Sequence, residues 1–314
     1  MNKNGTSNRI IILLTSFFLS TALLSVRIDK NKSDHVQKRI DYYTQELDED
    51  DDFQITAHRG FSSLEVENTR DSYTLANTKP YVDYIEMDAR MTKDGELVLS
   101  HNDNVVTCDD TVTYLSEKNY LDIISDEFKY YSPIGKYSIF PSEERSFINR
   151  RRFDLNSRRY KIIGLLEGLN CCGDKKVLLD LKFDNNYEEF TKELKEELKD
   201  VDTSDIIFQS LDPEGIKYLK EHSDYTCSVL IDSEEDLEYL DQFDNVGIRY
   251  NMLTSELIDK LFEEKDNIFV WTVNSEKTFN KASEKLGEHY KDVVYITDFP
   301  DLIETKLLMK EKGK

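Results

Sequence analysis

The stretch "YIEMDARMTKDGELVLSH", residues 84–101, determines how the rest of the chain can fold. Two β-rich runs, "YIEMD" and "ELVLS", are separated only by "ARMTKDG". Neighbouring parallel strands need a connection of about a dozen residues or more, which this gap cannot supply. The turn Lys93-Asp94-Gly95 is instead typical of a tight connection between antiparallel strands. The stretch therefore predicts a β-hairpin.

Short β-rich runs alternate with charged stretches over the remainder of the chain. With both hairpin arms included, the strand candidates are "FQITA" (53–57), "YVDYIEMD" (81–88), "ELVLS" (96–100), "KVLLDL" (176–181), "DIIFQS" (205–210), "TCSVLI" (226–231), "NVGIRY" (245–250), "NIFVWTV" (267–273) and "VVYIT" (293–297). Residues 187–200 and 254–265 carry apolar side chains at spacings of three and four, as amphipathic helices do. Such alternation predicts βα units around a parallel sheet. Without the "ELVLS" arm eight strands remain, which predicts a TIM (β/α)8 barrel with a small β-hairpin insertion; a doubly wound sheet is the alternative.

An uncharged apolar run precedes the predicted barrel. Lys3 and Arg9 come before "IIILLTSFFLSTALLSV", residues 10–26, which as a helix would reach roughly 25 Å at about 1.5 Å per residue. Residues 1–26 are therefore a signal peptide or a membrane anchor. A retained anchor is favoured because the apolar run continues beyond Ala22, where a weak cleavage-like pattern ends.

The segment after the apolar run is polar and acidic. Residues 27–52 end in "ELDEDDD" and are expected to form a solvated linker, so the barrel domain is predicted over 53–314. Positive residues before the apolar run favour a cytoplasmic N-terminus, which would place the barrel on the extracytoplasmic face of the cell membrane. Secretion of the cleaved protein is the alternative.

Charge and cysteine content narrow the classes of partner. Lys and Arg number 41 against 63 Asp and Glu, giving a net charge of −22. This balance argues against nucleic acid as a partner and requires local basic residues for any anionic substrate. The four cysteines show no metal-ligand spacing and are expected to be ordinary free thiols.

Polar residues occur where the predicted strands end, which is where a barrel of this type carries its chemistry. They are His58 and Arg59, Glu86 and Asp88, His101, and Asp180 and Lys182. Residues two apart in a strand project to the same face, so Glu86 lies beside Asp88 and Asp180 beside Lys182. Carboxylates that converge on one point repel each other unless a cation joins them, and all-oxygen ligation favours Mg²⁺ or Ca²⁺. Two histidines that flank the acids can supply acid and base catalysis near neutral pH.

The order of short motifs resembles the glycerophosphodiester phosphodiesterases of the phospholipase-C-like phosphodiesterase superfamily. The motifs are "HRG" (58–60), "ENT" (67–69), "EMD" (86–88), "TKDGELVLSH" (92–101), "LDLK" (179–182), "FQS" (208–210), "WTVN" (271–274) and "ITDFP" (296–300). The resemblance implies a TIM barrel that hydrolyses glycerophosphodiesters to an alcohol and glycerol 3-phosphate with one divalent cation, Ca²⁺ or Mg²⁺. The substrate would be a small molecule or a glycerol-phosphate polymer.

Roles follow from this resemblance for the matching positions. It makes His58 and His101 the acid/base pair, Arg59 and Lys182 phosphate-binding residues, Glu67 a supporting acid, Trp271 a pocket residue, and Glu86, Asp88 and Asp180 the metal ligands.

Two positions depart from the family pattern. His101-Asn102-Asp103 stands where His-Asp is usual, and Asp180 stands where Glu is usual. The related sphingomyelinase D group has a similar arrangement of acids. A lysophospholipase D or sphingomyelinase D-like activity, or hydrolysis of a teichoic-acid-type polymer, therefore remains as the alternative.

One basic segment stands out from the acidic chain. Residues 145–161 carry seven basic residues and one acid, a net charge of +6. The segment follows His101, so it is expected to begin on the mouth side of the barrel. It could gather a polyanionic substrate or contact lipid phosphates. Alternatively, it forms a solvated face paired with acids of the same protein.

Overall fold

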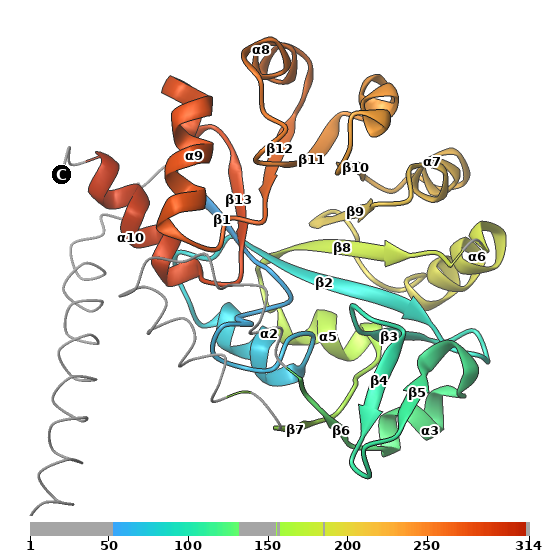
Figure 1. The fold of residues 1–314 in the computed structure, drawn as a ribbon. Helices are drawn as coiled ribbons and strands as arrows, with labels where there is room; N and C mark the ends of the chain where they lie inside the picture. The colour runs from blue at the N-terminus through green and yellow to red at the C-terminus, as the bar shows by residue number, and fades with distance from the viewer. Residues whose placement is uncertain (1–52, 132–154, 156–157, 185, 312–314) are drawn as a thin grey trace, which may run out of the picture. The chain divides into compact units, whose positions relative to one another are not determined.

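Eight parallel β-strands form the wall of a closed barrel in the computed structural model (Figure 1). The structure describes residues 53–131, 155, 158–184 and 186–311. The barrel strands, in spatial order, are β1 (Gln54–Ala57), β2 (Tyr84–Met91), β8 (Lys176–Lys182), β9 (Ile206–Ser210), β10 (Cys227–Ile231), β11 (Asn245–Arg249), β12 (Asn267–Trp271) and β13 (Val294–Thr297). Because β1 pairs in parallel with both β13 and β2, the sheet closes on itself. The predicted TIM barrel is confirmed, and the doubly wound alternative is wrong.

The predicted hairpin is also confirmed. Strand β3 (Leu97–Leu99) pairs antiparallel with β2, with Arg90 opposite Val98. In the turn, the Thr92 amide donates to the Glu96 carbonyl at 2.8 Å, and Gly95 has a positive φ of 91°. Glycine adopts this left-handed conformation without a steric penalty, so the sequence determines where the turn occurs.

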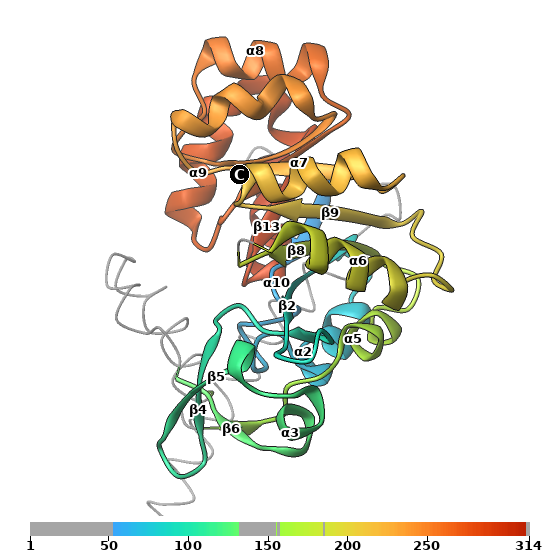
Figure 2. The same ribbon diagram turned by 90° about the vertical axis from the view of Figure 1, so that its right-hand side faces the viewer.

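Helices cover the outer side of the barrel strands (Figures 1 and 2). They are α2 (Arg70–Asn77), α5 (Leu165–Cys171), α6 (Tyr187–Glu197), α7 (Pro213–His222), α8 (Ser255–Glu264), α9 (Glu276–Leu286) and α10 (Pro300–Glu311). The helices expected over 187–200 and 254–265 correspond to α6 and α8. Between β10 and β11 the connection is instead the 3₁₀ helix η3 (Glu235–Gln242), and η4 (Gly287–Lys291) is a second 3₁₀ helix, before β13.

The barrel interior is apolar in its lower part and polar in its upper part, at the carboxyl ends of the strands. A buried cluster of side chains from five strands fills the lower part: Tyr84, Leu178, Ile207, Phe269, Val294 and Ile296. Tyr84 and Phe269 meet edge to face with ring centroids 5.5 Å apart. Since alternate residues of a strand share a face, Glu86 and Asp88 follow Tyr84 on the inner face of β2, towards its carboxyl end. The apolar layer thus supports a polar layer at the mouth.

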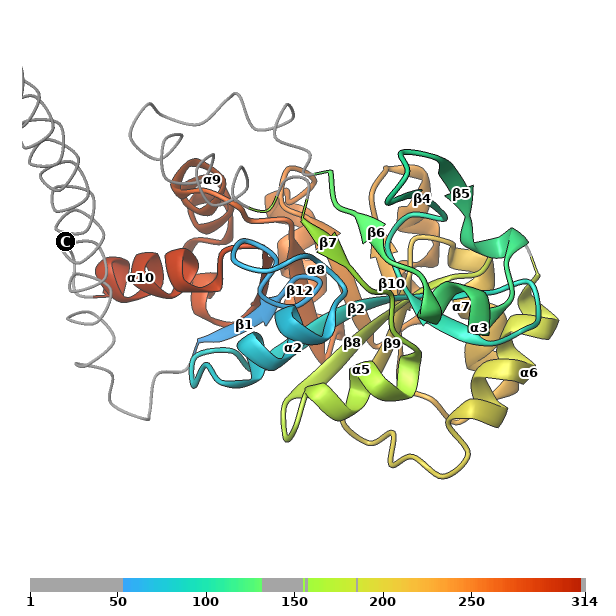
Figure 3. The same ribbon diagram turned by 90° about the horizontal axis from the view of Figure 1, so that it is seen from below.

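A second, four-stranded antiparallel sheet extends the hairpin into a larger insertion than the sequence predicted (Figure 3). Its strands are β4 (Asn104–Thr107), β5 (Val112–Tyr114), β6 (Phe128–Lys129) and β7 (Arg159–Tyr160), in the order β5-β4-β6-β7. The 3₁₀ helix η1 (Leu115–Glu117) and helix α3 (Tyr120–Ser125) lie between β5 and β6. A separate buried cluster, which includes Val98, Val105 and Phe128, packs this sheet against β3.

Several sequence predictions fall outside the described residues. The apolar run 10–26, the acidic linker 27–52 and most of the basic segment 145–161 are among them. In the part of the chain that the structure describes, no helix has the length and apolar character needed to span a membrane. At the end of the basic segment, Arg158 pairs with Glu65 at 3.0 Å and Arg159 with Glu127 at 3.6 Å, so these two arginines are matched by acids of the same chain. All four cysteines are free, as expected.

Candidate functional site

The predicted site residues converge on one cavity at the carboxyl ends of the barrel strands. The cavity has a volume of about 90 Å³. Of the nine predicted residues, its lining includes His58, Arg59, Glu86, Asp88, His101, Asp180, Lys182 and Trp271. The ninth, Glu67, lies outside this cavity but contacts Arg59. The polar residues predicted at the strand ends, which are spread over more than two hundred positions of the sequence, therefore form one site.

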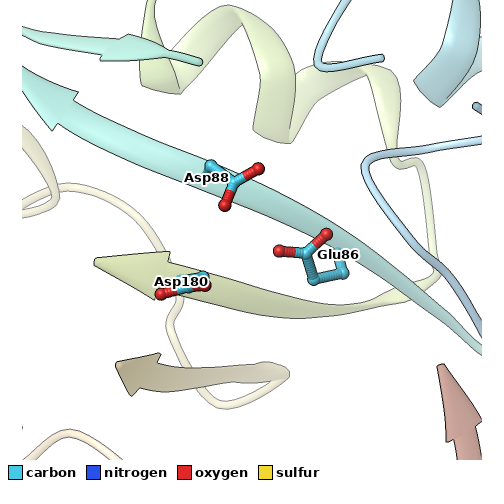
Figure 4. A group of neighbouring side chains, drawn as sticks. All are labelled: Glu86, Asp88 and Asp180. Carbon is cyan, nitrogen blue, oxygen red and sulfur yellow. The ribbon is translucent and has the colours of Figure 1, made fainter. Parts of the chain in front are cut away.

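Three carboxylates form the acidic part of the site. Glu86 and Asp88 project from β2 and Asp180 from the adjacent strand β8 (Figure 4). All three are buried, and one oxygen from each lies within 4.8 Å of the others. Although Asp180 is one methylene shorter than the glutamate usual in the family, its carboxylate still joins the group.

The environment of these carboxylates fits a divalent cation. Burial, with repulsion from Asp88 and Asp180, raises the pKa of Glu86 well above its usual value, and burial also raises the pKa of Asp180. The Oδ1 atom of Asp180 is buried and accepts no hydrogen bond from the described residues. Because buried carboxylate oxygens need a positive or donating partner, this all-oxygen group could hold a hard ion such as Mg²⁺ or Ca²⁺.

Two cationic side chains border the acids. The Lys182 Nζ atom lies 3.0 Å from Asp88 Oδ1 and 2.5 Å from Asp180 Oδ2, and Arg59 Nε lies 3.4 Å from Asp88 Oδ2. Burial alone would raise the pKa of Asp88, but Lys182 and Arg59 outweigh it and hold this pKa well below its usual range. Burial likewise opposes the charged forms of Lys182 and Arg59, yet the carboxylates raise both pKa values. Both cations therefore stay charged at the mouth of the barrel, where they can meet an anionic group.

A partly buried pair orients the ring of His58. The Nδ1 atom of His58 lies 2.6 Å from Asp298 Oδ1, and the Asn274 amide donates to Asp298 Oδ2 at 2.7 Å. The carboxylate only accepts, so Nδ1 carries a proton and Nε2 lies on the side of Glu86, 4.0 Å from Glu86 Oε2. Sequence analysis assigned no role to Asp298 or Asn274, although "ITDFP" and "WTVN" place both directly after barrel strands.

The second histidine has a different support. His101 follows β3, and its Nδ1 lies 2.9 Å from Asn102 Oδ1. Its carbonyl oxygen accepts from Arg90 Nε at 3.1 Å and Nη2 at 2.9 Å, which fixes the loop. Asp103, the acid nearest to the family's usual position, instead accepts from the amide and hydroxyl of Ser116. The departure from the family pattern therefore leaves a neutral amide, not a carboxylate, on the ring of His101.

Burial lowers the pKa of His101, although Asp88 opposes this shift. When protonated, the ring is therefore a stronger proton donor than a solvated histidine.

Glu67 acts on Arg59 rather than on the cavity itself. Its Oε1 accepts from Arg59 Nη1 at 2.7 Å and its Oε2 accepts from the Tyr130 hydroxyl at 2.9 Å. Next to it, Asn68 donates to Asp88 Oδ2 at 2.7 Å and accepts from the Asp88 amide at 3.1 Å. The "ENT" motif thus orients one cation and one carboxylate of the site. Sequence analysis found Glu67 but not Asn68 or Tyr130.

An aromatic wall completes the cavity. The guanidinium of Arg249 lies 5.4 Å from the ring centroid of Trp271, and Trp271 packs against the apolar layer below. Trp271 Nε1 and Gln209 Oε1 are buried with no hydrogen-bond partner among the described residues. Both residues line the cavity, so both can offer a polar atom to a ligand. Gln209 lies in the "FQS" motif, to which sequence analysis assigned no role.

Comparison with known proteins agrees with this geometry. The candidate glycerophosphodiester phosphodiesterase YhdW of Bacillus subtilis is 26% identical over 259 residues, which are 79% of this chain and 96% of YhdW. An Oleispira antarctica phosphodiesterase, solved with the product sn-glycerol-3-phosphate, shares the fold with a TM-score of 0.61 and 19% identity over 81% of this chain and 96% of its own. A Silicibacter pomeroyi structure named for the same activity gives a TM-score of 0.65 and 19% identity, covering 83% and 94% of the two chains.

The strongest comparison is with a protein family. The model of the glycerophosphoryl diester phosphodiesterase family matches residues 58–302, a range that includes every predicted site residue. The resemblance inferred from the motifs is thereby confirmed, and so is the predicted class of enzyme. The chain belongs to the glycerophosphoryl diester phosphodiesterase family.

Proposed function

We propose that this enzyme hydrolyses glycerophosphodiesters to an alcohol and glycerol 3-phosphate with the help of one divalent cation. The observation that carries the proposal is the convergence of three buried carboxylates, two cationic side chains and two histidines on one cavity. The product complex of the Oleispira antarctica phosphodiesterase supports the assignment of glycerol 3-phosphate as product.

Binding roles follow from charge. Glu86, Asp88 and Asp180 would hold the cation, Ca²⁺ or Mg²⁺, through oxygen atoms alone. A bound cation supplies Lewis-acid polarisation of a phosphoryl oxygen and neutralises charge on it. Arg59 and Lys182 bind the phosphodiester anion and stabilise the charge that builds during attack. Glu67 orients Arg59 for this task, and Trp271 lines the pocket that receives the substrate.

Proton transfer is assigned to the two histidines. His58, held by Asp298, accepts a proton at Nε2 from the attacking water or hydroxyl as its oxygen bonds to phosphorus. The bond from phosphorus to the alcohol oxygen then breaks, and His101 donates a proton to that oxygen. His101 lines both the site and a larger adjoining cavity, whereas His58 lines only the site, and this difference supports the assignment of His101 as the acid.

Phosphorus NMR of the products tests the proposal against its alternatives. The enzyme is incubated with a glycerophosphodiester, a lysolipid and a teichoic-acid-type polymer in the presence of Ca²⁺ or Mg²⁺. We expect glycerol 3-phosphate from the glycerophosphodiester as the main product. A cyclic phosphate released from the lysolipid, with the glycerophosphodiester left intact, would instead establish a lysophospholipase D or sphingomyelinase D-like activity.

A further inference from the structure

A second cavity adjoins the site, with a volume of about 380 Å³. One wall comes from the small sheet, through residues of β4, β6 and β7, and the other from the loop between β1 and α2. Figure 3 shows β6 and β7 beside this loop, and the bond from Tyr130 to Glu67 joins the two walls. Arg59 and His101 line both cavities, so the two spaces meet at the proposed phosphate ligand and the proposed acid.

The sizes of the two cavities suggest how a diester is divided between them. A phosphodiester carries two substituents, and the cavity that holds the acids and both histidines, of about 90 Å³, meets a much larger one, of about 380 Å³, at Arg59 and His101. The substituent on the far side of His101 must then occupy the larger cavity. Because His101 is proposed to protonate the departing oxygen, the occupant of that cavity is the leaving alcohol. This step rests on the function proposed above.

The charges around the larger cavity are already matched. Glu67 uses one oxygen for Arg59 and the other for Tyr130. Lys129, the other cation in the wall, pairs with Asp110 at 2.6 Å. Among the described residues that line it, the cavity therefore has no surplus carboxylate for a quaternary ammonium group and no surplus cation for a second anion. Its charge balance favours an uncharged occupant.

The wall of the larger cavity carries polar groups that are not hydrogen-bonded to other described residues, which makes it unsuited to an acyl chain. Tyr160 and Asn104 line the cavity, Asn104 from an exposed position of β4, and neither the hydroxyl of Tyr160 nor the side-chain amide of Asn104 is hydrogen-bonded to another described residue. The Tyr160 ring is held by Phe128 and Tyr130, with centroids 5.9 Å and 6.3 Å away. A fixed aromatic face beside free hydroxyl and amide groups suits a polyhydroxy compound, whose C–H face packs on the ring while its hydroxyls bond to the polar groups.

We propose that the small sheet forms a leaving-group subsite for an uncharged polyol such as glycerol or inositol. Tyr160 and Asn104 bind its hydroxyl groups, and His101 protonates the oxygen that leaves phosphorus. The insertion thereby selects glycerophosphodiesters by their alcohol and disfavours those of choline and of lysolipids.

The test compares substrates on matched variants. Tyr160→Phe keeps the packed ring and removes only the hydroxyl, and Asn104→Ala removes the amide. Tyr114→Phe is the control, because Tyr114 lies on β5 of the same sheet, is 48% exposed and does not line the cavity. On glycerophosphoinositol and glycerophosphoglycerol, each test variant should lose about 2- to 10-fold in kcat/KM, the scale of one hydrogen bond. On glycerophosphocholine each test variant should lose less than on these two substrates, and in Tyr114→Phe kcat/KM should stay unchanged on all three. Equal losses on all substrates, or a wild-type preference for the choline ester, would overturn the proposal.

Calorimetric titration separates this proposal from the proposed function. Wild type and Tyr160→Phe, each in the presence of Ca²⁺, are titrated with glycerophosphoinositol. If the wild type binds the compound without hydrolysing any diester, the proposed function fails while the subsite is still tested. A weaker affinity in Tyr160→Phe then supports the subsite, and equal affinities, or no binding to the wild type, refute it.

Discussion

The Nδ1 atom of His58 lies 2.6 Å from Oδ1 of Asp298, which connects the end of the first barrel strand to the end of the last. The carboxylate is in turn held at 2.7 Å by the Asn274 amide. A histidine oriented in this way presents a defined tautomer to the cavity. The pair therefore gives a direct test of whether His58 works as the base.

Replacing Asp298 by Asn should leave the fold intact and reduce kcat by at least about 100-fold. An asparagine amide can donate to Nδ1, which would move the ring proton to Nε2 and block proton acceptance there. Steady-state kinetics on a glycerophosphodiester measures the loss. Asp259→Asn, the same change at an exposed position of α8, serves as a control. Activity of Asp298→Asn close to that of wild type would show that His58 is not the base.

Metal dependence is tested at Asp180. Asp180→Asn removes an anionic ligand and should weaken Ca²⁺ or Mg²⁺ binding by at least about 10-fold, whereas Asp180→Glu keeps the charge and should bind far better than the amide variant. Isothermal titration of the metal-free protein measures both affinities. Full turnover in excess chelator would contradict a role for any metal.

The link from Tyr130 to Arg59 predicts coupled effects. Tyr130→Phe removes the hydroxyl that bonds to Glu67, and Glu67→Gln weakens the partner of Arg59. Each should raise KM several-fold, because a less fixed Arg59 binds the phosphodiester more weakly. The double variant should lose less kcat/KM than the product of the two single losses. Independent, multiplicative losses would mean that Tyr130 does not act through Glu67.

Stability should depend on pH through Glu197 on α6. Burial, with repulsion from Glu96, raises the pKa of Glu197 from 4.5 to about 7. Because the folded-state pKa is raised, the neutral carboxyl contributes its full stability below about pH 4.5, and this contribution is lost as pH rises through about 7. Glu197→Gln should therefore increase the free energy of unfolding by about 1 kcal/mol at pH 8, a value discounted for partial solvent exposure, and by little at pH 4. Urea unfolding at both pH values checks this, with Glu188→Gln on the same helix as control; an equal effect at both would refute it.

Cellular location remains a prediction from residues 10–26. If this run is a retained anchor with the barrel outside, protease added to intact cells should cut within 27–52 and release active enzyme. Immunoblotting of the medium measures the release. Cleavage that occurs only after lysis would place the barrel in the cytoplasm.

The barrel could be predicted because each of its elements is indicated by a short, continuous segment of the sequence. Each strand is a short β-rich run, the helices between them show their own periodicity, and the gap after "YIEMD" is too short for a crossover. The site could be predicted for a related reason. In a closed barrel the carboxyl ends of all strands face one mouth, so acids and histidines at those ends must meet.

The missed features depend on contacts between distant residues. Strands β6 and β7 have two residues each and pair across an intervening segment of 29 residues, so they leave no periodic signal. The role of Tyr130 depends on its contact with Glu67, 63 positions earlier in the chain. The acid beside the ring of His58 is 240 positions away.

The closure of the barrel between β1 and β13 has a consequence for biosynthesis. Strand β1, the first barrel strand to be synthesised, pairs with β2 and with β13. Because β13 is the last strand to be synthesised, one edge of β1 stays unpaired until the end of translation. Until then, the growing sheet has an unpaired edge that invites association with other chains. The contact between His58 and Asp298 is delayed in the same way, because Asp298 follows the last strand. A chain released from the ribosome before residue 298 therefore lacks the carboxylate that contacts the ring of His58.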